Sequence, residues 1–197
     1  MIVEKNTNPS DFHPIAHKNW VGAKDIKASF AFGHDGSNIY LLFEVEEPQV
    51  RAVNTEFNSS VWEDSCVEFF ISLGGDKNYY NFEINAIGTV LGAYGPDRHQ
   101  RHHLSDALLS QVTTTPSLGR DPIKNREQPT QWNMKVVIPI KALHYSKLDS
   151  LSGIDGHANF YKCGDKLKHP HFLSWKPVLT SSPDFHTPRY FGQLSFL

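Results

Sequence analysis

Four polar side chains have residue types and a spacing suited to holding a sugar. Asn81, Glu83 and Asn85 alternate along one stretch of the chain, and Glu68 comes shortly before them. Alternate residues of a β-strand point to the same face, so all four side chains would converge if the two stretches pair as a hairpin. Carboxylates and amides offer two hydrogen-bonding atoms in one plane, which suits neighbouring sugar hydroxyls. The alternative interpretation is an ordinary solvated outer face of a sheet.

Two tryptophans could supply the apolar contact that a sugar ring needs. Trp62 comes shortly before Glu68, and Trp175 lies near the C-terminus. An aromatic ring stacks on the C–H face of a sugar, and by analogy with stacked bases this contributes about 1–3 kcal/mol. Hydrogen bonds would then provide specificity, because a buried polar group left unpaired costs about 1–3 kcal/mol. The alternative for Trp175 is a core position at a strand end, which we also expect for Trp20 and Trp132.

The pair Glu68 and Glu83 also raises the alternative of a glycoside hydrolase, in which two carboxyl groups act as acid and base. A glycosidase usually needs a deep cleft over the scissile bond, and a small sandwich offers little room for one. The sequence has no nucleophile elbow, phosphate-binding loop or dinucleotide-binding glycine motif. We therefore predict binding without catalysis and assign no catalytic residue.

Metal sites are only weakly indicated. We expect Cys66 and Cys163 to be buried free thiols, with a disulfide as the next alternative, because two isolated cysteines lack the close spacing of zinc sites. A structural calcium held by loop aspartates and glutamates is a better prediction than a transition metal, although no EF-hand loop is present. The histidines that invite a metal interpretation fall in two groups: His99, His102 and His103 in one loop, and His169, His171 and His186 near the C-terminus.

The elements that must position these residues are strands. In the segment 66–72, Val67, Phe69 and Ile71 share one face and Glu68 lies on the other, which is the period of a half-buried strand. Glycine, aspartate and asparagine turns separate such segments, and only 104–110 and 139–144 could be helical. We predict an all-β, jelly-roll-like antiparallel sandwich forming one domain over residues 1–197. The expected strands are 26–32, 38–46, 66–72, 79–86, 89–94 and 131–138, with long loops at 95–103 and 115–130.

Composition narrows the class of partner. The chain has 197 residues, 39% of them hydrophobic and 20% charged, with a net charge of -2, which argues against nucleic acid or an anionic membrane. No apolar run approaches the roughly 20 residues of a membrane span. The first ten residues are too polar for a signal peptide, so we expect a cytoplasmic protein or one whose leader has been removed. We expect a monomer.

Several motifs together resemble the family 9 carbohydrate-binding modules. The run 61–71, VWEDSCVEFFI, is similar to their Trp-x-Asp-Asp/Ser-x-Val-Glu signature, and 80–88, YNFEINAIG, is similar to their next strand. The tail is similar to a branch of the family common in gut bacteria, and the resemblance runs from about Trp20 to the C-terminus. The tail motifs are NFYKCGD at 159–165, HFLSW at 171–175, PDFH at 183–186 and FG at 191–192.

This resemblance implies a sandwich related to the DOMON domains and a site in which Trp62 and Trp175 clamp a sugar while Glu68 binds a hydroxyl. It also implies structural calcium and a link to the breakdown of plant or dietary polysaccharide, with a xylan- or glucan-type oligosaccharide as partner. Some members carry a basic residue on the second strand, where this chain has Asn81, Glu83 and Asn85, and we expect Arg98 to substitute for it. A haem-binding DOMON relative is the other alternative, and it would need histidine pairs or Met134 as axial ligands.

Overall fold

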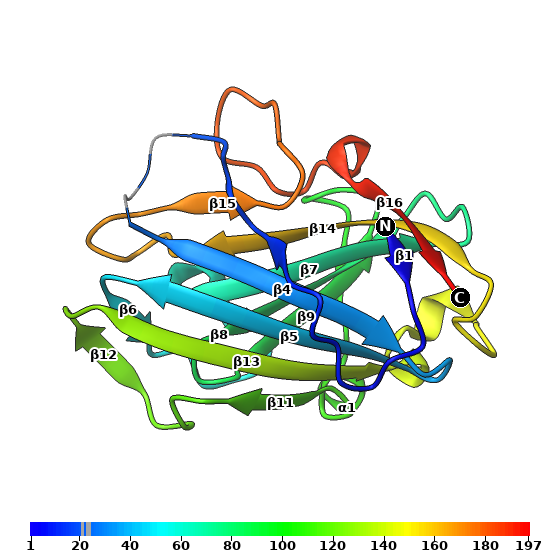
Figure 1. The fold of residues 1–197 in the computed structure, drawn as a ribbon, viewed down its shortest axis with the longest axis horizontal. Coiled ribbons are helices and arrows are strands. Elements are labelled where there is room, and N and C mark those ends of the chain that lie inside the picture. Colours follow the sequence, from blue (N-terminus) through cyan, green and yellow to red (C-terminus); the bar gives the residue numbers. More distant parts are fainter. Residues whose placement is uncertain (21, 23–24) are drawn as a thin grey trace.

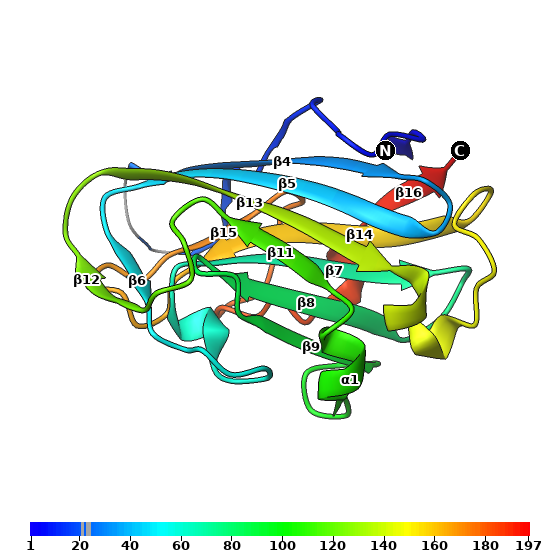
Figure 2. The same cartoon turned by 90° about the horizontal axis from the view of Figure 1, so that it is seen from below.

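A computed structural model describes residues 1–20, 22 and 25–197 as two β-sheets packed face to face (Figure 1). Figure 2 shows the two layers edge-on, with β4, β5 and β13 in one layer and β14, β7, β8 and β9 in the other. These strands are β4 (Lys27–His34), β5 (Asn38–Glu47), β13 (Thr130–Pro139), β14 (Asp155–Cys163), β7 (Cys66–Leu73), β8 (Tyr79–Asn85) and β9 (Val90–Gly95). The predicted all-β antiparallel sandwich is therefore confirmed.

The first sheet has the order β1-β16-β14-β7-β8-β9-β10, and a short strand, β15, also pairs with β14. The second sheet has the order β11-β13-β5-β4-β2, and β12 pairs with β6 beside it. Neighbours are antiparallel, except that β1 runs parallel to β16. The remaining strands are β1 (Ile2–Val3), β2 (His13–Pro14), β3 (His17–Lys18), which pairs with β15, β6 (Val50–Ala52), β10 (His102–His103), β11 (Thr113–Pro116), β12 (Ile123–Arg126), β15 (Phe172–Ser174) and β16 (Gly192–Phe196).

All six predicted strands are present, as β4, β5, β7, β8, β9 and β13, with ends shifted by a residue or two. The expected loops at 95–103 and 115–130 contain the short strands β10 and β12. The central strand β14 was not among the predictions, because polar residues such as Asn159 and Lys162 interrupt its apolar pattern. Helical structure in the described residues is limited to α1 (Asp106–Leu109) and the single turns η1 (Val61–Glu63), η2 (Ile140–Ala142), η3 (His144–Ser146) and η4 (Pro188–Tyr190).

Aromatic rings fill the space between the sheets. Phe160 of β14 stacks on Phe30 of β4, with ring centroids 3.5 Å apart, and on Phe69 of β7 at 4.9 Å. All three are fully buried, and burying one such side chain contributes about 1.5–3 kcal/mol. The predicted inward face of β7, with Val67, Phe69 and Ile71, is confirmed by their place in this core.

A buried ion pair joins the two sheets at one end of the core. The Lys162 ammonium of β14 lies 2.9 Å from the Glu47 carboxylate of β5, and neither side chain is exposed. Trp132 of β13 donates its indole N–H to Glu47 at 2.8 Å, and Lys162 donates to His171 at 2.7 Å. The expected core position of Trp132 is confirmed. Each charge has a partner here, which a charge in a protein interior requires.

Acid should destabilise this end of the core through His171. Burial, and then the charge of Lys162, lowers the pKa of His171 to about 2, whereas an unfolded histidine titrates near 6.5. The unfolded state therefore takes up the proton first, and stability falls as the pH drops below about 6.5. At pH 5 the expected loss is about 2 kcal/mol. Urea unfolding at pH 7.5 and pH 5 measures it, and His171→Gln, which can still accept from Lys162, should lose less; equal losses would contradict this assignment.

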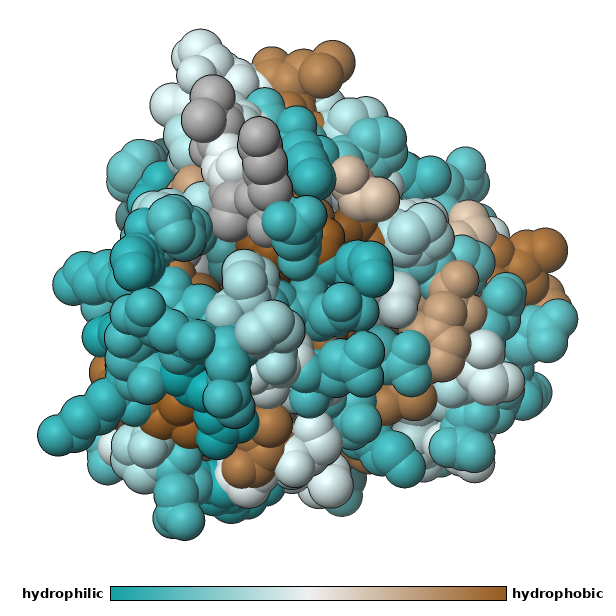
Figure 3. All heavy atoms as spheres, turned by 60° about the vertical axis from the view of Figure 1, so that its left-hand side comes forward, coloured by the Kyte–Doolittle hydropathy of each residue, from teal (hydrophilic) through white to brown (hydrophobic). Residues whose placement is uncertain are grey.

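The outer surface is mainly polar on the face shown in Figure 3, where small hydrophobic patches lie between hydrophilic side chains. Within the described residues, no helix has the length and apolar character needed to cross a membrane.

Candidate functional site

The face of the first sheet that points away from the core is covered rather than open to solvent. The chain crosses this face in the segment 175–191, where the phenol of Tyr161 stacks on Phe185 with centroids 4.1 Å apart and donates to its carbonyl at 3.2 Å. The alternative of a solvated outer face is thus wrong, because this segment buries the face in a second hydrophobic cluster. The buried members of that cluster are Val61, Cys66, Phe70, Tyr79, Leu91, Tyr161, Cys163, Val178, Phe185 and Phe191.

A cavity of about 100 Å³ opens within this cover, and two glutamates lie against it. Glu68 of β7 and Glu83 of β8 are directly opposite each other in the ladder, so the predicted hairpin is present and brings the two carboxyl groups together. Only 3% of each residue is exposed. The residues lining the cavity are Trp62, Glu68, Glu83, Arg98, Arg101, Cys163, Asp165, Phe172, Pro183, Asp184, Phe185 and His186.

Burial sets the protonation of the two glutamates. Removal from water, and then the charge of Glu83, raises the pKa of Glu68 well above its usual value. Burial also raises the pKa of Glu83 to about 7, against the opposing effect of Arg101. Asn81 donates its amide N–H to Glu83 at 3.0 Å and fixes that carboxyl group. The pair can therefore offer both donors and acceptors to a hydroxylated ligand.

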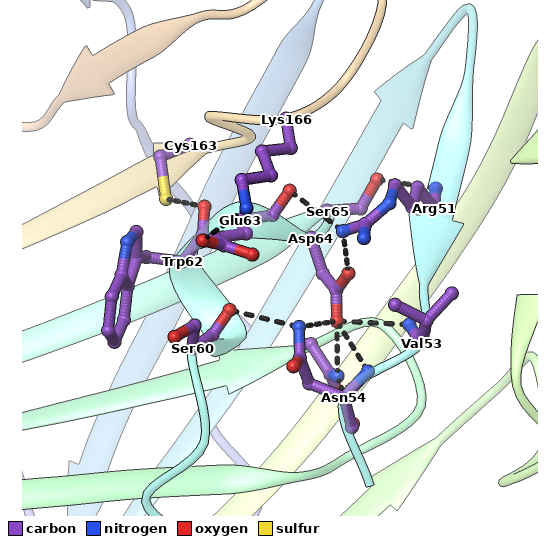
Figure 4. A network of polar contacts seen from close by, with 11 residues as sticks. Arg51, Val53, Asn54, Ser60, Trp62, Glu63, Asp64, Ser65, Cys163 and Lys166 are labelled. Carbon is purple, nitrogen blue, oxygen red and sulfur yellow. Dashed lines mark hydrogen bonds and ion pairs between the residues drawn. The ribbon is translucent and has the colours of Figure 1, made fainter. Parts of the chain in front are cut away.

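Trp62 forms one wall of the cavity and stands on the single turn η1. Its carbonyl accepts the N–H of Asp165 at 3.1 Å, and the next carbonyl, that of Glu63, accepts the N–H of Lys166 at 3.1 Å. The side chains of Glu63 and Lys166 add an ion pair at 2.8 Å. Figure 4 shows the indole of Trp62 beside this junction, pointing away from the polar network behind it. The turn is thus bound to the end of β14 and holds the indole in place.

The network behind Trp62 is centred on the fully buried Asp64 (Figure 4). One carboxylate oxygen accepts the backbone N–H groups of Val53 and Asn54, at 3.1 and 3.0 Å, and the side-chain amides of Asn54 and Asn85, each at 3.0 Å. The other oxygen accepts from Arg51. Asp64 thereby ties η1 to the loop after β6 and to the end of β8.

Both of the predicted asparagine ligands lie outside the cavity. Asn85 is fully buried and donates its amide N–H groups to Asp64 and to the carbonyl of Asn54. Its predicted direct contact with a sugar is therefore wrong. Asn81 is also fully buried and reaches the site only through Glu83. Both therefore support the residues that line the cavity.

The predicted pairing of Trp62 with Trp175 is also wrong, because Trp175 does not line this cavity. Its indole packs edge-on against Phe30 at 5.6 Å and Phe160 at 5.8 Å in the core between the sheets. The cause is strand alternation: along β15 and the residue after it, Trp175 shares the face of the core residue Leu173. Trp175 is itself only partly buried, and it packs against the core cluster, as its alternative interpretation expected.

Phe172 and Phe185 supply the other aromatic walls, and neither was predicted as a ligand. Trp20 packs behind both rings, at 6.0 and 5.8 Å, and donates its indole N–H to the Thr180 carbonyl at 2.8 Å. Trp20 therefore supports the cavity walls. It is partly buried and packs against the second hydrophobic cluster rather than between the two sheets. The position of Phe172 directly before the core residue Leu173 could have predicted that Phe172 points to the cavity face.

Charged groups surround the opening of the cavity. Arg98, which we predicted, lines it together with Arg101 from the same loop. Asp97 shapes this loop by accepting the backbone N–H groups of His99 and Gln100 at 2.7 and 2.8 Å. Arg101, Asp165, Asp184 and His186 are further lining residues that sequence reasoning missed.

The side chains that could bind a metal ion can be compared with the predicted calcium and transition-metal sites. Asp64, the most deeply placed loop aspartate, already accepts several N–H groups, so it offers no free oxygen to calcium. Among the residues that the structure describes, the group of three or more metal-ligating side chains within reach of one another is Cys66, Glu68 and Cys163, and it contains no histidine. Both cysteines are buried free thiols, as expected.

The sequence matches the family model for carbohydrate-binding family 9 over residues 4–196. The chain belongs to carbohydrate-binding family 9. No curated protein matches this family 9 chain. A solved structure of a candidate carbohydrate-binding protein from Bacteroides uniformis ATCC 8492 is 38% identical, with a TM-score of 0.95, covering 100% of this chain and 98% of that one.

Two solved structures share the fold of this family 9 chain at low identity. Both are of a family 9 carbohydrate-binding module from Caldicellulosiruptor kristjanssonii, one in complex with glucose and the other with cellotriose. They are 12% and 13% identical, and each has a TM-score of 0.63 and covers 100% of this chain, with 95% and 92% of the other chain covered.

Proposed function

We propose that the chain binds one sugar ring, at the end of a glucan- or xylan-type oligosaccharide, in the cavity between Trp62 and the Glu68–Glu83 pair, and that it does so without catalysis. The observation that carries this proposal is an indole wall beside two buried carboxyl groups. The apolar face of a sugar would lie on Trp62, Phe172 or Phe185, and its hydroxyls would bond to the glutamates. Membership of family 9 and the glucose and cellotriose complexes of the Caldicellulosiruptor module support it.

The size of the cavity favours a chain end over an internal segment of a polymer. Ligand clefts for drug-sized molecules have volumes of about 300–1,000 Å³, and this cavity, at about 100 Å³, suits a single ring. A hydrolase acting through Glu68 and Glu83 would need room for sugar on both sides of the scissile bond and for a water. The protein would accordingly serve polysaccharide breakdown by holding a product or substrate end.

Replacing Trp62 with alanine should weaken sugar binding roughly 10- to 100-fold, because the stacking contact contributes about 1–3 kcal/mol. Calorimetric titration with glucose, xylose, cellotriose and xylotriose measures the dissociation constants, which we expect between micromolar and millimolar for the parent chain. Far-ultraviolet circular dichroism verifies that the variant is folded.

The matched control for this experiment is Trp175→Phe, which changes a tryptophan of the core rather than one of the cavity. Its dissociation constants should stay within about twofold of the parent. Equal binding by the parent chain and Trp62→Ala would refute the proposed site, and so would an equal loss in both variants.

A further inference from the structure

Two cysteines and a glutamate form a compact group between the cavity and the second hydrophobic cluster. Cys66 of β7 and Cys163 of β14 are directly opposite each other on neighbouring strands. Glu68 points to the same face as Cys66, and the Cys163 thiol lies 3.0 Å from its carboxyl oxygen. The three potential ligand atoms all lie within 4.8 Å of one another. Residues far apart in the sequence thus present two sulfurs and one oxygen to a single point.

The glutamate distinguishes this group from an ordinary pair of core thiols. No ion pair among the described residues involves Glu68, and its carboxyl group contacts the Cys163 thiol instead. All three residues are at least 97% buried. Cys163 and Glu68 also line the cavity, so the group is closed by protein on one side and faces the cavity on the other.

We propose that Cys66, Cys163 and Glu68 bind one zinc ion, with its remaining coordination position directed toward the cavity. Zinc takes thiolate sulfur at about 2.3 Å and carboxylate oxygen at about 2.0–2.2 Å in a tetrahedral arrangement. Sulfurs in that arrangement are about 3.8 Å apart, and the three potential ligand atoms here already lie within 4.8 Å of one another. The two sulfurs select a thiophilic ion over calcium, which takes oxygen ligands.

The cavity beside such a site has both basic and acidic side chains. Two thiolates and one carboxylate around Zn²⁺ leave a single negative charge. Arg98 and Arg101 line the cavity beside it, together with the acidic residues Glu83, Asp165 and Asp184. Lys162, on the core side, is already paired with Glu47. Without a metal, burial raises the pKa of Cys66 to about 12, so the thiols stay protonated until a cation displaces their protons.

Cobalt(II) is the probe for this site, because thiolate ligation gives it a charge-transfer absorption in the near ultraviolet that histidine or carboxylate ligation does not. The chain is first reduced and freed of metal with a chelator, and then titrated with Co²⁺ and afterwards with Zn²⁺. We expect one Co²⁺ per chain with this absorption, and its complete loss when Zn²⁺ displaces the cobalt. The measurement involves no sugar, so its result is independent of the proposed function.

Variants show which residues provide the ligands. Cys66→Ser and Cys163→Ser should each lose the absorption, and circular dichroism of the metal-free proteins shows that they are folded. Glu68→Gln keeps both thiols and should bind Co²⁺ at least tenfold more weakly while keeping the absorption. The surface control is His102→Ala with His103→Ala, which should bind like the parent chain. Absence of the absorption in the parent chain, or its persistence in both cysteine variants, would overturn the proposal.

Discussion

Replacing Asp64 with asparagine is expected to lower the free energy of unfolding by about 3–5 kcal/mol and to abolish sugar binding. The carboxylate is fully buried and accepts hydrogen bonds from two backbone N–H groups, two side-chain amides and Arg51. An asparagine would turn an N–H group toward some of these donors and leave the Arg51 charge without a partner. Because η1 is held through Asp64, the indole of Trp62 would also lose its fixed position. Urea unfolding and calorimetric titration with cellotriose measure the two effects.

The matched control for this prediction is Asp35→Asn. Asp35 also accepts several hydrogen bonds, from the backbone N–H groups of Ser37 and Asn38 and from the Tyr40 hydroxyl, but it is exposed. Water can replace these contacts, so its substitution should cost about 1 kcal/mol and leave sugar binding unchanged. If the two variants were destabilised equally, the burial of Asp64 would not be the source of its importance.

Replacing Lys162 with methionine should cost about 3–5 kcal/mol in unfolding free energy, because Glu47 is then a buried carboxylate without its cation. Methionine fills much of the volume of the lysine stem, so the loss reports the missing charge rather than a cavity. Trp132 would remain as a donor to Glu47. Chemical unfolding at neutral pH measures the change.

A double-mutant cycle separates the ion pair from its packing. Glu47→Gln keeps an oxygen for Trp132 to bond and removes the negative charge. Combined with Lys162→Met, it should restore at least half of the stability that the lysine substitution removes, because no isolated charge is left in the core. Additive losses in the double variant would show that the two groups act independently and would contradict the interpretation.

Sequence alternation predicted the strands and their inward faces because one residue in two along β7 and β8 is apolar. Val67, Phe69 and Ile71 could be assigned to the core in this way, and the opposition of Glu68 and Glu83 followed from the hairpin. The central strand β14 is buried on both faces and contains a paired lysine, so its polar residues conceal it. A buried ion pair places charged residues where an apolar run would otherwise mark a strand that is buried on both faces.

The site was predicted only in part, because the segment that covers it is irregular. The sequence assigns Glu68 and Glu83 to one face, but it does not show that the segment 175–191 lies over that face. This segment has no strand period, so its partner surface is determined by contacts such as Phe185 on Tyr161. Trp175 was assigned to the sugar site because it is a tryptophan, although its position two residues after the core residue Leu173 places it on the core face of the sheet. Counting parity from that core residue would have placed it inside.

The parallel pairing of β1 with β16 has a practical consequence for presenting this protein. Ile2 and Asp155 both pair with Ser195, so both chain termini lie beside the start of β14, and Figure 1 shows them close together. The cavity residue Cys163 is at the other end of the same strand, roughly 26 Å away at roughly 3.3 Å per residue. A tether, fluorophore or solid support attached at either terminus would therefore leave the mouth of the cavity accessible to large, immobile glycans.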